Sequence, residues 1–98
     1  MTIRNRITGS GTADPTHLLA NPANWRIHPE HQQRALEGAL REIGWTEGVL
    51  VNEQTGQVVD GHLRVELALR RGEQAIPVTY VDLTVEEERL VLATLDPM

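Results

Sequence analysis

The sequence predicts an α+β domain, a small mixed β-sheet with helices, and three observations support this class. The chain has 98 residues, which suits one domain with a single core. Stretches with helical periodicity alternate with short runs of valine, leucine and isoleucine that are typical of strands. The elements are expected in the order loop, helix, hairpin, helix, strand and helix, with no internal repeat.

The amino-acid composition limits the kinds of functional site that the chain can form. The chain has no cysteine, which excludes a disulfide framework, a thiolate zinc site and a thiol nucleophile. All nine basic residues are arginine, which favours bidentate contacts wherever an anion is bound. The formal net charge of −5 argues against a chain that coats DNA by itself. No stretch resembles a membrane span or a signal peptide, so we expect a soluble cytoplasmic protein with no membrane partner.

The first 20 residues are predicted to be an N-terminal strand or a flexible lead-in, ahead of a domain over residues 21–98. Weak apolar alternation at Ile3 and Ile7 precedes a Gly/Ser-rich turn pattern at Gly9–Thr12, and this leaves both interpretations open.

An amphipathic helix is predicted from Pro29 to Ile43, because apolar residues recur at helical spacing on one side. Proline is suited to the first helical position, and Gly44 is placed to end the helix. This helix and the one after the hairpin are expected to cover one face of the sheet. The apolar side carries Leu36, Ala39, Leu40 and Ile43.

Three strands are predicted after this helix. Val49–Val51 and Val58–Val59 should form a hairpin, because turn-forming residues separate them. A further strand is predicted over Val78–Val81. Pro77 is expected to start that strand rather than to lie inside a central ladder, because proline donates no backbone hydrogen bond.

The functional prediction rests on the stretch Val58–Arg64, where a strand runs through a glycine into a helix predicted over Gly61–Arg71. The first turn of a helix presents unpaired amide N–H groups, which together with the helix dipole favour a phosphate oxyanion. His62 and Arg64 lie in the same turn and can add donors. An alternative stays open, in which Asp60 only caps the helix and both side chains are solvated.

A last helix is predicted from Val85 to about Leu95, since Thr84 and Glu87 fit a capping box. Its second half is more apolar than one helix face can bury. This predicts packing on a second copy, as a homodimer through the C-terminal helix, or on a continuation of the chain.

The central residues resemble a known family. Asp60-Gly61-His62-Leu63-Arg64, followed by Ala68, Gly72 and Ile76-Pro77-Val78, is similar to the D-G-H-x-R form of the phosphate-binding box in the ParB/sulfiredoxin-like superfamily. The resemblance covers about Asn21 to Leu95 and is to the ParB N-terminal, or ParB-like nuclease, domain. The pattern N-P-x-N-W-R-x-H-P is similar to members found in phage and mobile-element proteins, often beside DNA-processing functions.

The resemblance implies a ligand and a role. A nucleotide triphosphate of the CTP or ATP type, carrying magnesium, would be held by its phosphates at Gly61, His62, Leu63 and Arg64. Arg26 matches an arginine that lies near the nucleotide in this family, although an arginine stacked on Trp25 is equally compatible with the sequence. The domain would be accessory or regulatory in DNA processing, and would reach DNA through an additional domain or an oligomer.

Two other interpretations stay open. The first is a nuclease, phosphotransferase or nucleotide hydrolase on the same fold, with Asp60 or Glu30 as general base beside a metal-bound phosphate. The second is a protein-interaction module without ligand binding. Sulfiredoxin activity is excluded, because the chain lacks the cysteine of that branch. ParB proteins carry G-E-R-R and a later E-N-x-x-R, which Leu95–Pro97 does not match, so metal-dependent CTP hydrolysis does not follow from the resemblance.

No resident metal site is predicted. His28 and His31 could share a helix face, but the sequence places no third ligand with them.

Overall fold

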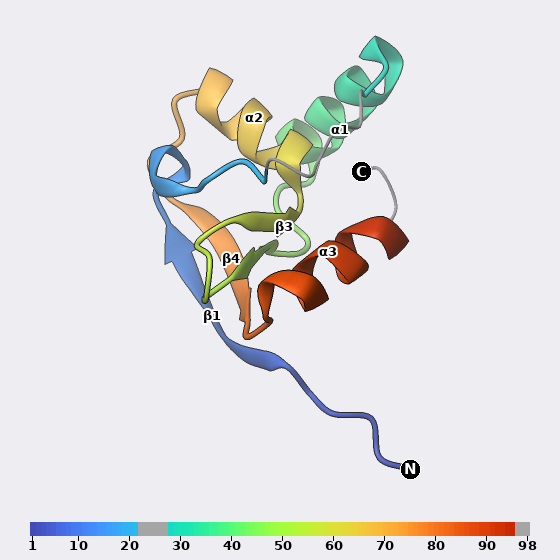
Figure 1. The fold of residues 1–98 in the computed structure, drawn as a ribbon. Helices are drawn as coiled ribbons and strands as arrows, with labels where there is room; N and C mark the ends of the chain where they lie inside the picture. The colour runs from blue at the N-terminus through green and yellow to red at the C-terminus, as the bar shows by residue number, and fades with distance from the viewer. Residues whose placement is uncertain (22–27, 96–98) are drawn as a thin grey trace.

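The computed structural model describes residues 1–21 and 28–95 and has the predicted α+β architecture. A four-stranded mixed sheet lies at its centre, and helices pack beside it (Figure 1). In chain order the elements are β1 (Ile7–Ala13), the 3-10 helix η1 (Pro15–His17), α1 (Glu30–Glu42), β2 (Val49–Asn52), β3 (Val58–Asp60), α2 (His62–Arg70), β4 (Ile76–Val81) and α3 (Val85–Thr94).

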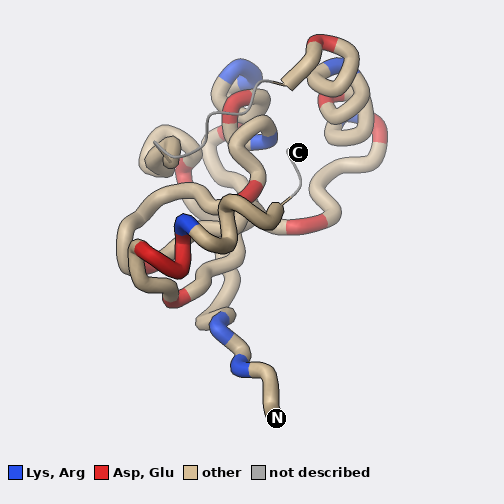
Figure 2. Tube along the Cα trace, turned by 45° about the vertical axis from the view of Figure 1, so that its right-hand side comes forward, with Lys and Arg blue, Asp and Glu red and all other residues tan. Residues whose placement is uncertain are grey.

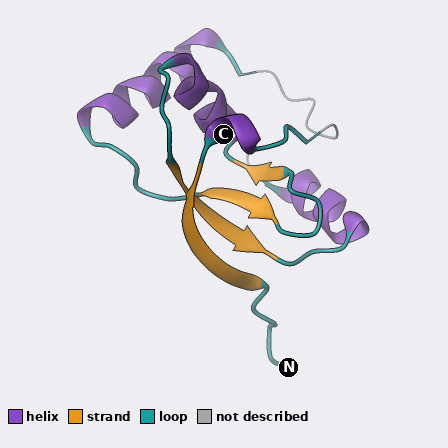
Figure 3. Ribbon diagram, turned by 90° about the vertical axis from the view of Figure 1, so that its left-hand side faces the viewer, coloured by secondary structure: helices purple, strands orange, loops and turns teal. Residues whose placement is uncertain are grey.

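The strands lie in the order β1-β4-β2-β3. β2 and β3 form the predicted antiparallel hairpin, and β4 runs parallel to β2 on its other side. The N-terminal segment contributes a strand to the same sheet, since β1 pairs antiparallel with β4 as the outermost strand (Figure 3). None of the helices in residues 1–21 and 28–95 is both long and apolar enough to cross a membrane.

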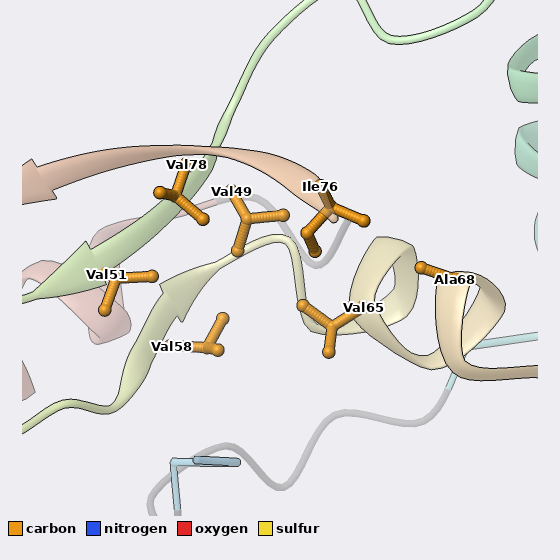
Figure 4. Packing of buried hydrophobic residues seen from close by; sticks show 7 residues of the cluster. All are labelled: Val49, Val51, Val58, Val65, Ala68, Ile76 and Val78. Carbon is orange, nitrogen blue, oxygen red and sulfur yellow. The ribbon is translucent and has the colours of Figure 1, made fainter. Parts of the chain in front are cut away.

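The core is built from small branched side chains. Valines of β2, β3 and β4 pack against the inner side of α2 (Figure 4). Trp45 and Tyr80 are partly buried and pack against this cluster. This follows from the composition, since the chain has no phenylalanine and few aromatic residues. The buried cluster consists of Val49, Val51, Val58, Val65, Ala68, Ile76 and Val78.

Pro77 is the second residue of β4, an interior strand that begins at Ile76, two residues before the predicted start at Val78. The register explains how the sheet accepts it. Pairing with β2 begins only at Val78, opposite Val49, so Pro77 has a partner on one side only, Thr12 of β1. The missing N–H therefore removes no hydrogen bond on the β2 side of the strand.

Helix α1 has the predicted amphipathic pattern, but none of its residues is buried, and Ile43 beyond its end is 77% exposed. It does not cover the sheet as expected; its contacts are mainly with α2. The polar groups at this contact include Arg71 and Glu37, whose Nη1 and Oε1 atoms lie 3.6 Å apart. Pro29 is the N-cap rather than the first helical residue, and Gly44 ends the helix with φ 105° as predicted. An apolar stripe shows that a helix has one side to bury, not that this chain buries it.

A buried polar network fastens α3 to the hairpin. The Asn52 side-chain amide donates to the Leu83 carbonyl and to Glu88 Oε1, each at 3.0 Å, and its oxygen accepts from the Leu83 N–H at 3.0 Å. The Thr55 hydroxyl donates to the same Glu88 oxygen at 2.6 Å. Because Asn52 and Glu88 are both buried, these bonds satisfy groups that would otherwise be costly to remove from water.

The first turn of α3 is also tied to the N-terminus. The predicted capping box is present, with Glu87 N–H donating to Thr84 Oγ1 and Thr84 N–H donating to Glu87 Oε1. Both Arg6 guanidinium nitrogens donate to the Glu87 carboxylate, at 2.7 and 2.8 Å. Together with the Thr84 backbone N–H, they lower the pKa of Glu87 from 4.5 to about 2.

We therefore predict an acid-dependent loss of stability at this junction. Because the folded-state pKa of Glu87 lies below its unfolded value, its contribution is complete above about pH 4.5 and is lost as pH falls through about 2. Arg6→Gln should lower the melting temperature at pH 7, and the difference from wild type should shrink between these pH values. Circular dichroism melts measure this, with Arg4→Gln on the exposed arm as control. A difference that does not change with pH would contradict the assignment.

Candidate functional site

The turn between β3 and α2 is built on a left-handed glycine. β3 ends at Asp60, and Gly61 follows as N-cap of α2 with φ 100° and ψ 23°, a conformation that L side chains rarely adopt. The alternative in which Asp60 caps the helix is wrong. Gly61 holds that position and offers no side-chain oxygen to the amides of the first turn, which begins at His62. These amides are the groups that an anion would bind.

The side chain of Arg64 folds back against this glycine. A Cβ at position 61 would lie 2.8 Å from Arg64 Nη2 and 3.2 Å from its Cζ. Arg64 is only 6% exposed, so its guanidinium is almost wholly removed from water. Two features therefore favour glycine at position 61. One is its left-handed backbone conformation, and the other is the Arg64 guanidinium, which occupies the space of a side chain.

Two carboxylates balance the buried charge. Arg64 Nη1 lies 3.2 Å from Glu47 Oε1 and donates to the Glu47 carbonyl at 3.3 Å, while Nη2 lies 3.8 Å from Asp60 Oδ2. The side chain of Glu47 is 72% exposed, whereas that of Asp60 is about one third exposed. One positive and two negative groups give these three side chains a formal charge of −1.

Glu47 was not predicted as a site residue. It lies in the connection between α1 and β2, 17 residues before Arg64, and no local motif marks it. The sequence signal that could have found it is general. A buried arginine needs a carboxylate partner, and Glu47 lies two residues before the start of the strand β2, which packs beside the turn.

The other residues of the predicted box contribute differently. Leu63 is buried in the core, so only its backbone N–H can serve a ligand. His62 is partly exposed, and its Nε2 accepts a hydrogen bond of 3.4 Å from the backbone N–H of Asn21. The imidazole thus already contacts the segment that precedes residues 22–27.

The remaining candidates are Arg26 and Glu30, of which the structure describes only Glu30. Arg26 lies outside the described residues. Glu30 starts α1, where its carboxylate lies 3.4 Å from Arg34 Nη1, and no described contact links it to Asp60 or Arg64. Across residues 1–21 and 28–95, no three His, Asp or Glu side chains come close enough to hold a metal ion.

A cavity of about 200 Å³ opens beside Arg64. Its walls are mostly apolar and come from the last turns of α1 and the connection to β2, including Leu36, Leu40 and Trp45. Arg64 and Glu47 are its charged lining residues. A mostly apolar wall with a few polar groups is typical of small-molecule sites.

The turn, the mixed sheet and its flanking helices together define a ParB-like domain, and comparison with known proteins agrees. No protein-family profile matches the chain. It is 30% identical over 66 residues to the ParB-like nuclease domain-containing protein YnaK of Escherichia coli (strain K12), a match that covers 67% of this chain and 75% of YnaK. The chain therefore belongs to the ParB-like nuclease domain family, within the ParB/sulfiredoxin-like superfamily.

Solved structures share the fold. The C-terminally truncated chromosome-partitioning protein ParB of Caulobacter crescentus, complexed with CTP-gamma-S, aligns with a TM-score of 0.73 and 26% identity over 87% of this chain and 51% of that one. The same protein complexed to the centromeric parS site aligns with a TM-score of 0.65 and 24% identity, over 83% of this chain and 43% of that one. Sulfiredoxin of Arabidopsis thaliana aligns with a TM-score of 0.70 and 20% identity, over 87% of this chain and 98% of that one. The chain thus spans about half of the Caulobacter ParB chain.

We predict that Gly61→Ala destabilises the fold more than a matched glycine substitution. Gly72 also has positive φ, at 72°, but a Cβ there would meet nothing within 4 Å. Gly72→Ala should cost about 1 kcal/mol of backbone strain. Gly61→Ala should cost about 3 kcal/mol, because the new Cβ would also displace a buried, paired guanidinium. Urea denaturation measures both, and equal losses would show that Arg64 does not depend on the space at Gly61.

Proposed function

We propose that this domain binds a nucleotide of the CTP or ATP type through its phosphates at Gly61-His62-Leu63-Arg64, and that it acts as an accessory or regulatory module in DNA processing. The observation that carries the proposal is the left-handed Gly61 cap. It leaves the amides at the start of α2 without a side-chain cap and places the Arg64 guanidinium beside them. The CTP-gamma-S complex of the related Caulobacter ParB supports the choice of ligand.

Phosphate binding at this turn requires an exchange of partners. Arg64 is already paired with Glu47 and Asp60, so an incoming phosphate meets a formal charge of −1. Glu47 is mostly exposed and can swing into water at little cost, which frees the Arg64 donors for a phosphate oxygen. Magnesium carried by the nucleotide would offset the remaining repulsion, because Asp60 and Glu47 offer the carboxylate oxygens that this ion prefers.

Isothermal titration with CTP, ATP and ADP, each with magnesium, tests the proposal. At least one nucleotide should bind in the micromolar range, and replacing Arg64 by Gln should remove that binding. Because Arg64 is buried, the variant must first be shown to be folded by its circular dichroism spectrum and its melt. Binding no tighter than millimolar by every nucleotide would overturn the proposal.

The exchange of partners gives a second prediction. Glu47→Gln removes the competing charge and should tighten nucleotide binding about threefold, the effect of removing one exposed ion pair. Glu53→Gln, an exposed acid in the hairpin turn, is the control and should leave the affinity unchanged. Unchanged or weaker binding by the Glu47 variant would show that this carboxylate does not compete with the ligand.

An enzyme on the same fold is the second candidate, a nuclease or phosphotransferase with Asp60 as general base. The observation favouring it is the position of Asp60 at the end of β3, partly exposed and next to the Arg64 guanidinium. Glu30, exposed and paired with Arg34, is the weaker candidate for this role. Plasmid nicking or phosphate transfer that is lost in Asp60→Ala, while the variant stays folded, would favour this function.

A third candidate is an interaction module that forms a homodimer through the C-terminal helix. Leu90 on α3 is 68% exposed, and Val85 is also exposed, so part of the apolar surface of this helix is accessible. Sedimentation of Leu90→Asp against wild type tests this contact.

The parS complex of Caulobacter ParB supports a role near DNA, for which this chain would use a further domain or an oligomer.

A further inference from the structure

The two edges of the sheet differ in how they are protected. β3 is only three residues long, and the preceding chain covers part of it, because Leu19 forms a bridge with Gln57 and accepts a hydrogen bond of 2.9 Å from Val58 N–H. β1 is seven residues long and forms the opposite edge. Within the described part of the chain, no strand pairs with its outer side. In an antiparallel ladder every second residue turns its N–H and C=O away from its partner, so this side carries a row of open backbone groups.

Over Gly9–Ala13, β1 lacks the usual devices that stop such an edge from pairing. Proteins protect exposed edges with charged residues, proline, bulges or a covering segment. Ile7–Ala13 contains no charged residue and no proline, and all its residues except Ala13 are exposed. A register shift lies between Ile7 and Gly9, at one end, and leaves Gly9–Ala13 regularly paired with β4.

Both ends of the strand are anchored to the rest of the domain. At one end Arg6 pairs with Glu87 and donates to the Asp82 carbonyl. At the other end Asp14 caps η1, and Pro15 is buried. These anchors keep a glycine-containing strand extended although its side chains bury little surface. The outermost strand in Figure 3 lies away from the helices, so a second strand can approach its outer side.

The sequence of this edge is complementary to itself. Thr8-Gly9-Ser10-Gly11-Thr12 reads the same in both directions. If two copies pair antiparallel about a two-fold axis at Ser10, each Gly9 lies opposite Gly11 of the second copy, within the regularly paired part of β1. Thr8 lies at the register shift and is left out of this pairing. A two-fold axis makes the interface closed and symmetric.

We propose that β1 is a self-association edge, and that its partner is β1 of a second copy of this chain. The pairing joins the two four-stranded sheets into one.

Charge supports a second copy as the occupant but keeps the affinity low. Arg4 and Arg6 precede the uncharged strand in the sequence, and Figure 2 shows basic positions along the N-terminal arm. Asp14 follows the other end of β1, so antiparallel pairing brings the basic end of one strand to the acidic end of the other. Each copy carries a net charge of −5, however, and the copies repel at long range. Added salt should therefore strengthen the association.

Cysteine cross-linking tests the pairing and its register, because the chain has no cysteine of its own. Ser10→Cys places two thiols opposite each other at the axis, with Cα atoms about 4.5–5.5 Å apart, within disulfide range. Thr12→Cys is the matched control on the same strand. Its two thiols would be separated by four residues of strand, about 13 Å, and cannot bond. Under mild oxidation, Ser10→Cys should give a covalent dimer and Thr12→Cys should not.

Sedimentation without cross-linking completes the test. Wild type should form a concentration-dependent dimer that salt strengthens. Ser10→Lys should be monomeric, because it opposes two like charges at the axis while leaving the exposed strand otherwise intact. A dimer that persists in Ser10→Lys but is lost in Leu90→Asp would assign association to α3 and overturn the proposal. Equal cross-linking of the two cysteine variants, or a monomer at every concentration, would also overturn it.

Discussion

The structure around the β3–α2 turn depends on one constraint, a guanidinium that is buried beside a glycine. An arginine removed from water must keep carboxylate or carbonyl partners, since an unpaired buried charge costs several kcal/mol. Arg64 meets this requirement with Glu47 from one connection and Asp60 from the end of β3. A Cβ at Gly61 would force the same guanidinium to shift from its place. Arg64 therefore links three parts of the chain: the end of β3, the start of α2 and the α1–β2 connection.

Much of the fold could be predicted because its signals are local. The hairpin, the capping box at Thr84 and the helix ends at Gly44 and Gly72 each depend on residues within a few positions of one another. The position of Pro77 could not be predicted in the same way. Whether a proline fits inside a strand depends on where the neighbouring strand begins, and the sequence does not state that register.

At the candidate site, too, the sequence predicted what nearby residues determine and missed what distant contacts determine. The motif identified Gly61 and Arg64, which lie together at the turn. It left open whether Asp60 caps the helix, and it did not identify Glu47. A cap is decided by backbone torsion angles, and Gly61 adopts the left-handed conformation that places it, not Asp60, at the helix start. The sequence also could not predict that no residue of α1 is buried. An apolar stripe does not tell whether another part of the chain packs against it. Glu88 shows the opposite error: it lies in an acidic stretch that the sequence suggests is exposed, yet it is buried and accepts hydrogen bonds from Asn52 and Thr55.

The two carboxylates at Arg64 differ in a way that bears on function. Asp60 is fixed by its strand, where it pairs with Leu50, whereas Glu47 belongs to a connection and its side chain is mostly in water. Releasing an exposed carboxylate costs about 1 kcal/mol or less, while leaving Arg64 unpaired would cost about 3–5 kcal/mol. An incoming phosphate would therefore replace Glu47 and leave Asp60 in place, so that the guanidinium is never without a partner. If a nucleotide binds as proposed, fold stability and ligand binding are inseparable at Arg64, whereas a change at Glu47 would alter the affinity with little effect on the fold.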